Sequence, residues 1–319
     1  MGIKREGNLI LWEEYFEEFR DWLKIFPPYK RKNGQKSLAI SSMNHCFKAL
    51  NTFLETIRRK KRIKIPQIKC QLYPRKYLAL KGYESVIDPS DFEKVFKAAS
   101  ELDAICADGY YIARHTGLRE NELFGLSLSD FYSGSPQDEV IQKKCALYEL
   151  KPFGYIIIDS QPENSLKIRD GNSHVIRKPL KHKNAILPEN ARVIPIIDKK
   201  AFNILVKRWR EQRDLFNIQK YGKDRKNYLL FDGLNKNKYY NTMAKAYGKA
   251  QAKYHSPHDT RHSFCTEMAR LTNGDMFFCQ MILGHTDKKT TERYWHISEA
   301  IQRNLKSDTQ IQDDIEFAI

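Results

Sequence analysis

The chain has 319 residues, of which 41% are hydrophobic and 12% aromatic, with a formal net charge of +16 and a sequence pI of about 9.4. This length exceeds that of one ordinary domain, and the apolar content excludes a disordered chain. The basic balance suits a polyanion: DNA, RNA or an acidic membrane. Residues 1–84 hold 19 Lys and Arg against 8 Asp and Glu, a net of +11, whereas the other 235 residues carry +5. By itself this excess fits a solvated basic surface as well as a binding face.

The cysteines and the apolar runs bear on the cellular context. The six cysteines form no Cys-x-x-Cys pair, so we predict free thiols and neither a zinc site nor a disulfide framework. No apolar run follows Met1, and no stretch reaches the roughly 18 apolar residues of a membrane span. We therefore expect a cytoplasmic protein without a signal peptide and without a membrane partner.

Two helices are predicted in the basic N-terminal part. Residues 9–26 place apolar side chains at helical spacing, and Pro27 ends that pattern. Ser41 or Ser42 is a candidate N-cap for a second helix that runs to about Ile57. A cationic run follows this helix, so the segment reads as a small all-α domain with a basic face.

A second domain is predicted to begin after a linker. Residues 65–87 contain prolines and glycine, show no sustained period and remain basic. Asp88-Pro89-Ser90 is typical of a helix start, and Phe92, Val95 and Phe96 would form the core face of that helix.

A change of pattern after residue 119 predicts a small antiparallel sheet followed by more helices. Three β-like runs are separated by polar turns, at residues 154–160, 174–180 and 192–196. Helices resume at Lys199 and continue to about Leu305. The stretch 132–170 is interpreted as an insertion without a derivable role.

Five residues form a set suited to attack on a phosphodiester. TGLRENEL contains Arg119, a His-x-x-Arg pair consists of His258 and Arg261, and a Leu-Gly-His ends at His285, nine residues before Tyr294. Two guanidinium groups would neutralise the phosphate, the imidazoles would handle protons and hydrogen bonds, and the tyrosine would be the nucleophile. Each piece alone has an ordinary explanation, such as a surface arginine or a core aromatic, but the joint pattern favours the chemistry. No carboxylate cluster typical of a two-metal site is apparent, so neither metal nor cofactor is expected.

These motifs resemble those of the tyrosine recombinases, the phage integrase family, and the resemblance runs from about Leu9 to Leu305. It implies a mostly α fold with a small antiparallel β-sheet. The two expected domains are an all-α, SAM-like core-binding domain in residues 1–82, including the linker, and an α+β catalytic domain in residues 83–306. They would clamp DNA from opposite sides.

The resemblance also implies a role for each site residue. Tyr294 would form a 3′-phosphotyrosyl link without ATP, Arg119 and Arg261 would hold the phosphate, His258 would assist proton movement and His285 would donate a hydrogen bond. Glu122 would support Arg119, Gly284 would allow the tight turn before His285, and His296 would have a supporting role. The family also uses a lysine on a β-hairpin as general acid; Lys181 is favoured for it here, with Lys183 and Lys178 as the alternatives.

The resemblance further implies partners and an assembly. We expect binding to double-stranded DNA core sites, action as a homotetramer, and association with the nucleoid; an accessory directionality factor is left open. Residues 307–319 are acidic and amphipathic, so they are interpreted either as a helix that docks on a neighbouring protomer or as a frayed end.

Several readings of the function stay open. Integration or excision of a mobile element is favoured over resolution of chromosome or plasmid dimers and over inversion of a segment. Relaxation of supercoils by a type IB topoisomerase-like activity uses the same chemistry. A DNA-binding accessory protein without catalysis is the alternative from another class, ahead of an RNA-binding module.

Overall fold

A computed structural model of the chain describes residues 15–22, 40–61, 85–162, 177–180, 183, 186, 190–218 and 225–284. The chain divides into two compact units, residues 1–81 and 82–319. The roles of these units as core-binding and catalytic domains remain predictions. Of the tail 307–319, no residue belongs to the described part.

The described part of the N-terminal unit is helical. Residues 15–22 form one helix, and α2 (Ile40–Lys61) forms another. Their apolar side chains meet, since Phe16 and Phe47 are buried and the Phe19 and Phe47 rings lie 6.2 Å apart edge to face. These contacts agree with the all-α reading of this segment.

Helix α2 differs from its predicted bounds at both ends. It begins at Ile40, ahead of both serines considered as caps, and it continues to Lys61 beyond the predicted end near Ile57. The extension carries ion pairs, because Glu55 contacts Arg58 at 2.6 Å and Arg59 at 3.0 Å, one helical turn away. The first basic residues after Ile57 therefore belong to the helix.

In the second unit, helix α3 (Pro89–Leu102) begins where the sequence predicted. The Asp88 side chain accepts hydrogen bonds from the backbone N–H groups of Ser90 and Asp91, and proline occupies the first turn. Phe92 is buried, and its ring stacks on that of Tyr110 at 4.9 Å. Tyr110 lies on α4 (Ala104–Thr116), so this contact joins the first two helices of the unit.

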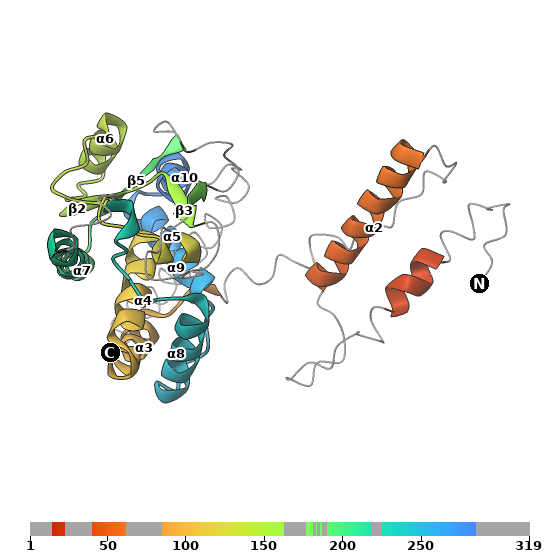
Figure 1. The fold of residues 1–319 in the computed structure, drawn as a ribbon, viewed down its shortest axis with the longest axis horizontal. Coiled ribbons are helices and arrows are strands. Elements are labelled where there is room, and N and C mark those ends of the chain that lie inside the picture. The colour runs from red at the N-terminus through yellow and green to blue at the C-terminus, as the bar shows by residue number, and fades with distance from the viewer. Residues whose placement is uncertain are drawn as a thin grey trace, which may run out of the picture. The chain divides into compact units, whose positions relative to one another are not determined.

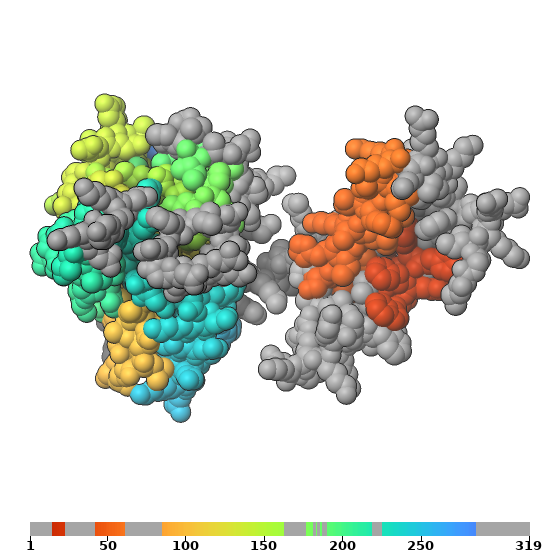
Figure 2. Space-filling view, viewed as in Figure 1, coloured from red at the N-terminus to blue at the C-terminus, as the bar shows by residue number. Residues whose placement is uncertain are grey.

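Further helices complete the unit, and the segments around α4 come from distant parts of the sequence. Figure 1 shows α3, α4 and α8 at one end of the unit and the strands at the other. Figure 2 shows α3 and α8 side by side on the surface. The remaining helical elements are α5 (Glu120–Phe124), α6 (Glu139–Leu147), α7 (Lys199–Ile218), the 3-10 turn Arg225–Asn227, α8 (Lys236–Lys249), α9 (Pro257–Leu271) and α10 (Met276–Leu283).

The described strands form two small antiparallel sheets rather than one. A three-stranded sheet has the order β1-β2-β5, and β3 pairs separately with β4. The bounds are β1 (Phe131–Ser133), β2 (Gly154–Ile158), β3 (Ser160–Pro162), β4 (Arg177–Pro179) and β5 (Arg192–Ile196). Ile156 of β2 faces both Phe131 and Ile194 across the larger sheet, and all three are buried.

The break between the two sheets falls at Asp159. Its carboxylate oxygens accept hydrogen bonds from Lys226 Nζ at 2.6 and 2.7 Å, so a polar contact interrupts the apolar run predicted as one strand. The stretch 132–170 also contains β2, the central strand of the larger sheet, and is therefore not a simple insertion.

Among the helices described, none is long and apolar enough to cross a membrane.

Candidate active site

The TGLR segment makes a turn that only glycine fits. Helix α4 ends at Gly117, whose φ of 62° lies in the left-handed region. A Cβ at this position would lie 2.3 Å from Phe264 Cδ1 and 2.9 Å from Leu283 Cδ2. The missing side chain thus lets the chain pass close to α9 and α10, and two residues later Arg119 is the N-cap of α5.

Arg119 lies at the N-terminus of α5, with a side chain that is 23% exposed. Its Nη1 donates to Glu122 Oε1 at 2.8 Å, and its backbone N–H donates to Glu122 Oε2 at 2.7 Å. Its Nη2 donates to the backbone carbonyl of Gly284 at 3.0 Å. The expected contact between Glu122 and Arg119 is present, and Arg119 also reaches the residue before His285.

Helix α9 carries the His-x-x-Arg pair. Ser256 and Pro257 begin this helix, and the Ser256 N–H donates to Asp259 Oδ2 at 2.7 Å. His258 is exposed, and its ring meets that of His262 edge to face at 4.6 Å. The helix therefore presents an imidazole at its first turn, one turn before Arg261.

Arg261 is buried, with 2% of the residue exposed. Its guanidinium donates to two backbone carbonyls, that of Gly117 at the TGLR turn and that of Leu283 at the end of α10. Arg119 and Arg261 therefore bind consecutive carbonyls, those of Gly284 and Leu283.

The C-terminal end of α10 is the point on which these arginines converge. Gly284 adopts a left-handed φ of 63°, as the turn before His285 was predicted to require, and its N–H donates to Gln280 at 2.8 Å. The last carbonyls of a helix carry its partial negative charge and lack helical partners. The two guanidinium groups supply both the hydrogen bonds and the opposite charge.

Glu122 is the counter-charge of this cluster. Its side chain is 1% exposed, and it accepts from Arg119 and, through both oxygens, from Arg192. Burial raises the pKa of this carboxyl, but the charge of Arg192, followed by those of Arg119 and Arg261, outweighs burial and holds the pKa at about 2. Glu122 is thus a carboxylate at neutral pH.

Arg192 is a residue that sequence reasoning missed. It is buried at the first position of β5, a segment for which only a β-like run was predicted. An arginine opening an otherwise apolar strand, RVIPI, is a signal that could have prompted the search for a buried carboxylate partner.

The N-terminal end of α10 is held by the segment 132–170. Asp275 Oδ1 accepts from the Phe278 N–H at 2.9 Å as the helix cap, while Oδ2 accepts from Lys144 Nζ at 2.5 Å and Tyr148 OH at 2.7 Å. The hydrogen bond to Asp275, with a smaller contribution from burial, raises the pKa of Tyr148 to about 12. The segment for which no role was predicted therefore contacts the helix that leads to His285.

The lysine hairpin is only partly described. Lys178 lies on β4 opposite Gln161, and Lys183 is exposed, with its N–H donating to the Leu180 carbonyl at 2.9 Å. Lys181 lies outside the described residues, so the choice among the three lysines stays open. The strand itself is anchored, because Arg177 donates to the carbonyls of Gly125 and Lys226 at 2.7 and 3.0 Å.

Of the predicted set, the structure brings together Arg119 and Arg261 at the α4 and α10 turns, and His258 lies one helical turn before Arg261 on α9. Three further residues, Lys181, His285 and Tyr294, lie outside the described part of the chain, as does His296. Their roles stay predictions.

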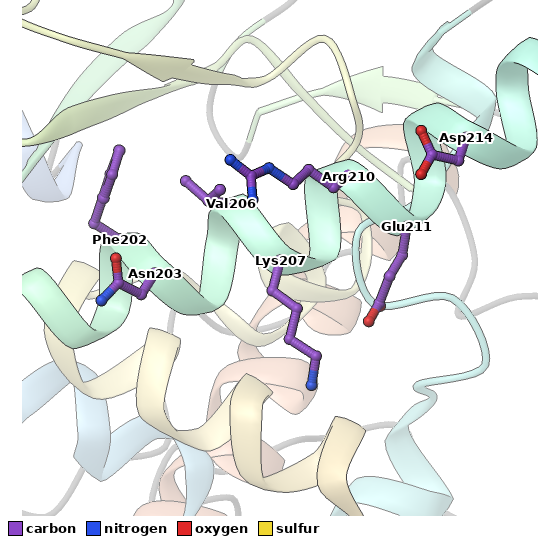
Figure 3. A pocket seen from close by; sticks show the side chains of 7 residues that line it. All are labelled: Phe202, Asn203, Val206, Lys207, Arg210, Glu211 and Asp214. Carbon is purple, nitrogen blue, oxygen red and sulfur yellow. The ribbon is translucent and has the colours of Figure 1, made fainter.

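A hollow of about 570 Å³ lies along α7 and is separate from these residues. Its lining runs from Phe202 to Asp214 on that one helix, and Figure 3 shows these side chains pointing away from several sides of the helix. It contains none of the predicted site residues.

Comparison with known proteins gives a family match over part of the chain. Residues 165–300 match the sequence model of the phage integrase family, a span that includes the positions of His258, Arg261, His285 and Tyr294 but not Arg119. Over this span the chain is similar to the phage integrase family, the tyrosine recombinases. This similarity supports a tyrosine site-specific recombinase activity.

Solved structures share the fold of this chain. The XerH site-specific recombinase bound to palindromic difH substrate, in a post-cleavage complex, superposes with a TM-score of 0.56 at 15% identity, covering 97% of this chain and 73% of that one. The Tn1549 transposon integrase in complex with circular intermediate DNA has a TM-score of 0.55 at 16% identity, covering 91% and 81%. At this identity the likeness establishes the fold, and it confirms the predicted fold class. A search of curated proteins gave no match.

Proposed function

We propose that this protein is a tyrosine site-specific recombinase that cleaves and rejoins double-stranded DNA through a 3′-phosphotyrosyl intermediate on Tyr294, without metal or ATP, to integrate and excise a mobile element. The proposal names Arg119 and Arg261 as the phosphate-binding pair. His258 assists proton movement, His285 donates to the phosphate, and Lys181 protonates the leaving 5′-oxygen.

One observation carries the proposal: the two arginines meet at the turn that leads to His285. Arg119 reaches Gly284 across 165 residues of sequence, and Arg261 reaches Gly117 across 144. A fold that brings two guanidinium groups to one turn supports a site that neutralises a phosphate, because each group can hold non-bridging oxygens and stabilise the charge of the transition state.

The exposure of Arg119 and His258 supports access for DNA. Arg119 keeps 23% of its side chain exposed, and His258 is exposed at the start of α9. The buried Arg261 would supply a second positive charge, which its two carbonyl contacts hold in place. Preorganised cations of this kind need no rearrangement when the negative charge develops.

The chemistry balances without an external energy source. The Tyr294 hydroxyl gives its proton to the proposed acceptor His258 and its oxygen attacks the phosphorus. The bond to the 5′-oxygen then breaks, and a proton from the proposed Lys181 ammonium completes the leaving hydroxyl. The tyrosine phosphodiester keeps the energy of the broken bond, so a second hydroxyl can reverse the reaction and rejoin the strand.

The proposal also covers the assembly of the protein and its biological role. We propose a homotetramer on core sites, held together through residues 307–319. A mobile element is favoured over dimer resolution because the hairpin and the stretch 132–170 are long, and the latter contributes α6. The directionality factor is left to experiment.

Covalent capture from a DNA library tests the proposal. Genomic fragments that span the gene and its flanks, each nicked so that the cut end diffuses away, are incubated with the protein in EDTA and without ATP. Protein-linked fragments are then recovered under denaturing conditions and sequenced. The comparison uses Tyr294→Phe and, as a matched control, Tyr254→Phe, which alters another tyrosine that is 47% exposed.

Capture by the wild-type protein and by Tyr254→Phe, but not by Tyr294→Phe, is the expected result. Fragments from the ends of an element around the gene support integration, whereas one chromosomal locus elsewhere supports dimer resolution. DNA binding without capture would favour the accessory-protein alternative. Relaxation of a plasmid that lacks the captured site would favour the topoisomerase-like alternative.

A further inference from the structure

The Arg192 side chain lies between two parts of the proposed site. It is 7% exposed, at the start of β5, and both of its Nη atoms donate to Glu122. Its Nε, also buried, has no hydrogen-bond partner in the described structure. A buried guanidinium normally uses all its hydrogen-bond donors. Here only the Nη donors are used, so the carboxylate and the surrounding packing hold the group in place.

Glu122 couples Arg192 to Arg119. The same oxygen, Oε1, accepts from Arg192 Nη1 at 2.8 Å and from Arg119 Nη1 at 2.8 Å. The other oxygen accepts from Arg192 and from the backbone N–H of Arg119 at 2.7 Å. A displacement of the carboxylate therefore moves both the side chain and the backbone of Arg119.

Arg192 also packs on the turn before His285. A Cβ on Gly284 would lie 3.0 Å from Arg192 Cδ and 3.1 Å from its Nη1, so the arginine side chain covers the face of this glycine. The Gly284 carbonyl in turn accepts from Arg119 Nη2 at 3.0 Å. The four residues Arg192, Glu122, Arg119 and Gly284 form a closed ring of contacts.

We propose that Arg192 is a positioning residue of the recombination reaction, which aims Arg119 at the scissile phosphate through Glu122 and fixes the Gly284 turn without touching DNA. This inference rests on the proposed function. The competing explanation is that Arg192 only stabilises the fold as half of a buried ion pair.

A matched ion pair elsewhere in the unit separates the two explanations. Arg208 is 8% exposed, and its Nε and Nη2 donate to Asp108 at 2.9 and 2.6 Å. It contacts none of the proposed site residues. Arg208→Met therefore removes a comparable buried arginine without disturbing the ring.

The experiment measures single-turnover formation of the covalent complex on the duplex recovered by capture, together with DNA affinity and thermal stability. Each protein is assayed on the normal phosphodiester and on a duplex with a methylphosphonate at the scissile position. The methyl group replaces a charged oxygen, so an arginine that neutralises this charge matters less on the second substrate.

Arg192→Met is expected to cleave the phosphodiester about 100-fold more slowly than wild type, the size typical of losing one preorganised donor, with DNA affinity within about threefold. On the methylphosphonate the deficit should shrink to less than about tenfold. In an Arg119→Ala background, Arg192→Met should add little, because residues that act as a unit are not additive. Arg208→Met should cleave at the wild-type rate well below its melting temperature.

Arg192→Lys is a second variant, which keeps the inference testable if Arg192→Met does not fold. It keeps the charge but loses the two-pronged contact, so we expect it to fold and to cleave about tenfold more slowly. With an active wild type, two results would overturn this inference and leave the proposed function standing. One is an Arg192→Lys protein that cleaves at the wild-type rate. The other is a deficit of equal size on both substrates. A wild type that forms no covalent product would overturn the proposed function and this inference with it.

Discussion

The two ends of helix α10 are held by different physical means. At the C-terminal end, three arginines from separate segments meet one buried carboxylate and the last carbonyls of the helix. At the N-terminal end, Asp275 caps the helix and binds Lys144 and Tyr148 from a partly exposed segment. An interior charge cluster loses stability steeply when one member is removed, whereas a cap near the surface is replaced in part by water. The comparison predicts that substitutions at the C-terminal end of α10 lower the free energy of unfolding much more than substitutions at its N-terminal end.

The largest effect is expected at the buried end. Glu122→Gln leaves the guanidinium groups of Arg119 and Arg192 without their counter-charge, so it should lower the free energy of unfolding by about 3–5 kcal/mol. Urea titration followed by circular dichroism measures this. The control is Glu139→Gln, whose side chain is 82% exposed and whose effect should stay below about 0.5 kcal/mol.

The pH dependence sharpens the same comparison. The pKa of Glu122 is about 2 in the folded protein against a usual 4.5, so its contribution is present above pH 4.5 and is lost as the pH falls toward 2. The difference in stability between wild type and Glu122→Gln should therefore shrink across this window. A difference that stays constant from pH 6 to pH 2 would mean that the carboxylate is not held by the arginines.

An intermediate effect is expected from Gly117→Ala, beneath the same end of α10. The new methyl group would meet the Phe264 ring, and the left-handed backbone adds strain, so we expect a loss of about 2–4 kcal/mol. Gly233→Ala is the matched control, because Gly233 also has a positive φ but a Cβ there meets nothing within 4 Å. Equal melting temperatures for the two variants would show that Phe264 and Leu283 do not pack tightly against Gly117.

The smallest effect is expected at the N-terminal end of α10. Asp275→Ala removes the cap and the acceptor for Lys144 and Tyr148, and it should cost about 1–2 kcal/mol. Asp275→Asn keeps an oxygen for the cap and should recover most of that loss. Hydrogen exchange of the α10 amides measures both variants; a loss as large as that of Glu122→Gln would remove the distinction between the two ends.

Sequence reasoning succeeded where the signal is local. The Asp88 cap, the helix that carries His258 and Arg261, and the glycine turn at Gly284 follow from residues within a few positions of one another. The fold class also followed from the motifs, because spacing and flanking residues matched a known family.

The contacts that complete the site are not local, and they were missed. Arg192 meets Glu122 across 70 residues, and Lys144 meets Asp275 across 131. No periodicity or propensity links such positions, since tertiary packing alone brings them together. For the same reason the sequence did not separate the sheet into two at Asp159, whose partner Lys226 is 67 residues away. The lysine assignment stayed open because three lysines lie within six positions of one hairpin.

The long separation between Arg119 and Gly284 also bears on how the enzyme is made. A ribosome that adds about 5–20 residues per second completes Arg119 roughly 10 to 30 seconds before Gly284, which lies 165 residues later. Glu122 is synthesised before its partner Arg192, 70 residues later, and Arg119 is synthesised before both Arg261 and the turn at Gly284. On the proposed function, a partly synthesised chain therefore has its basic N-terminal residues before it has a complete cleavage site.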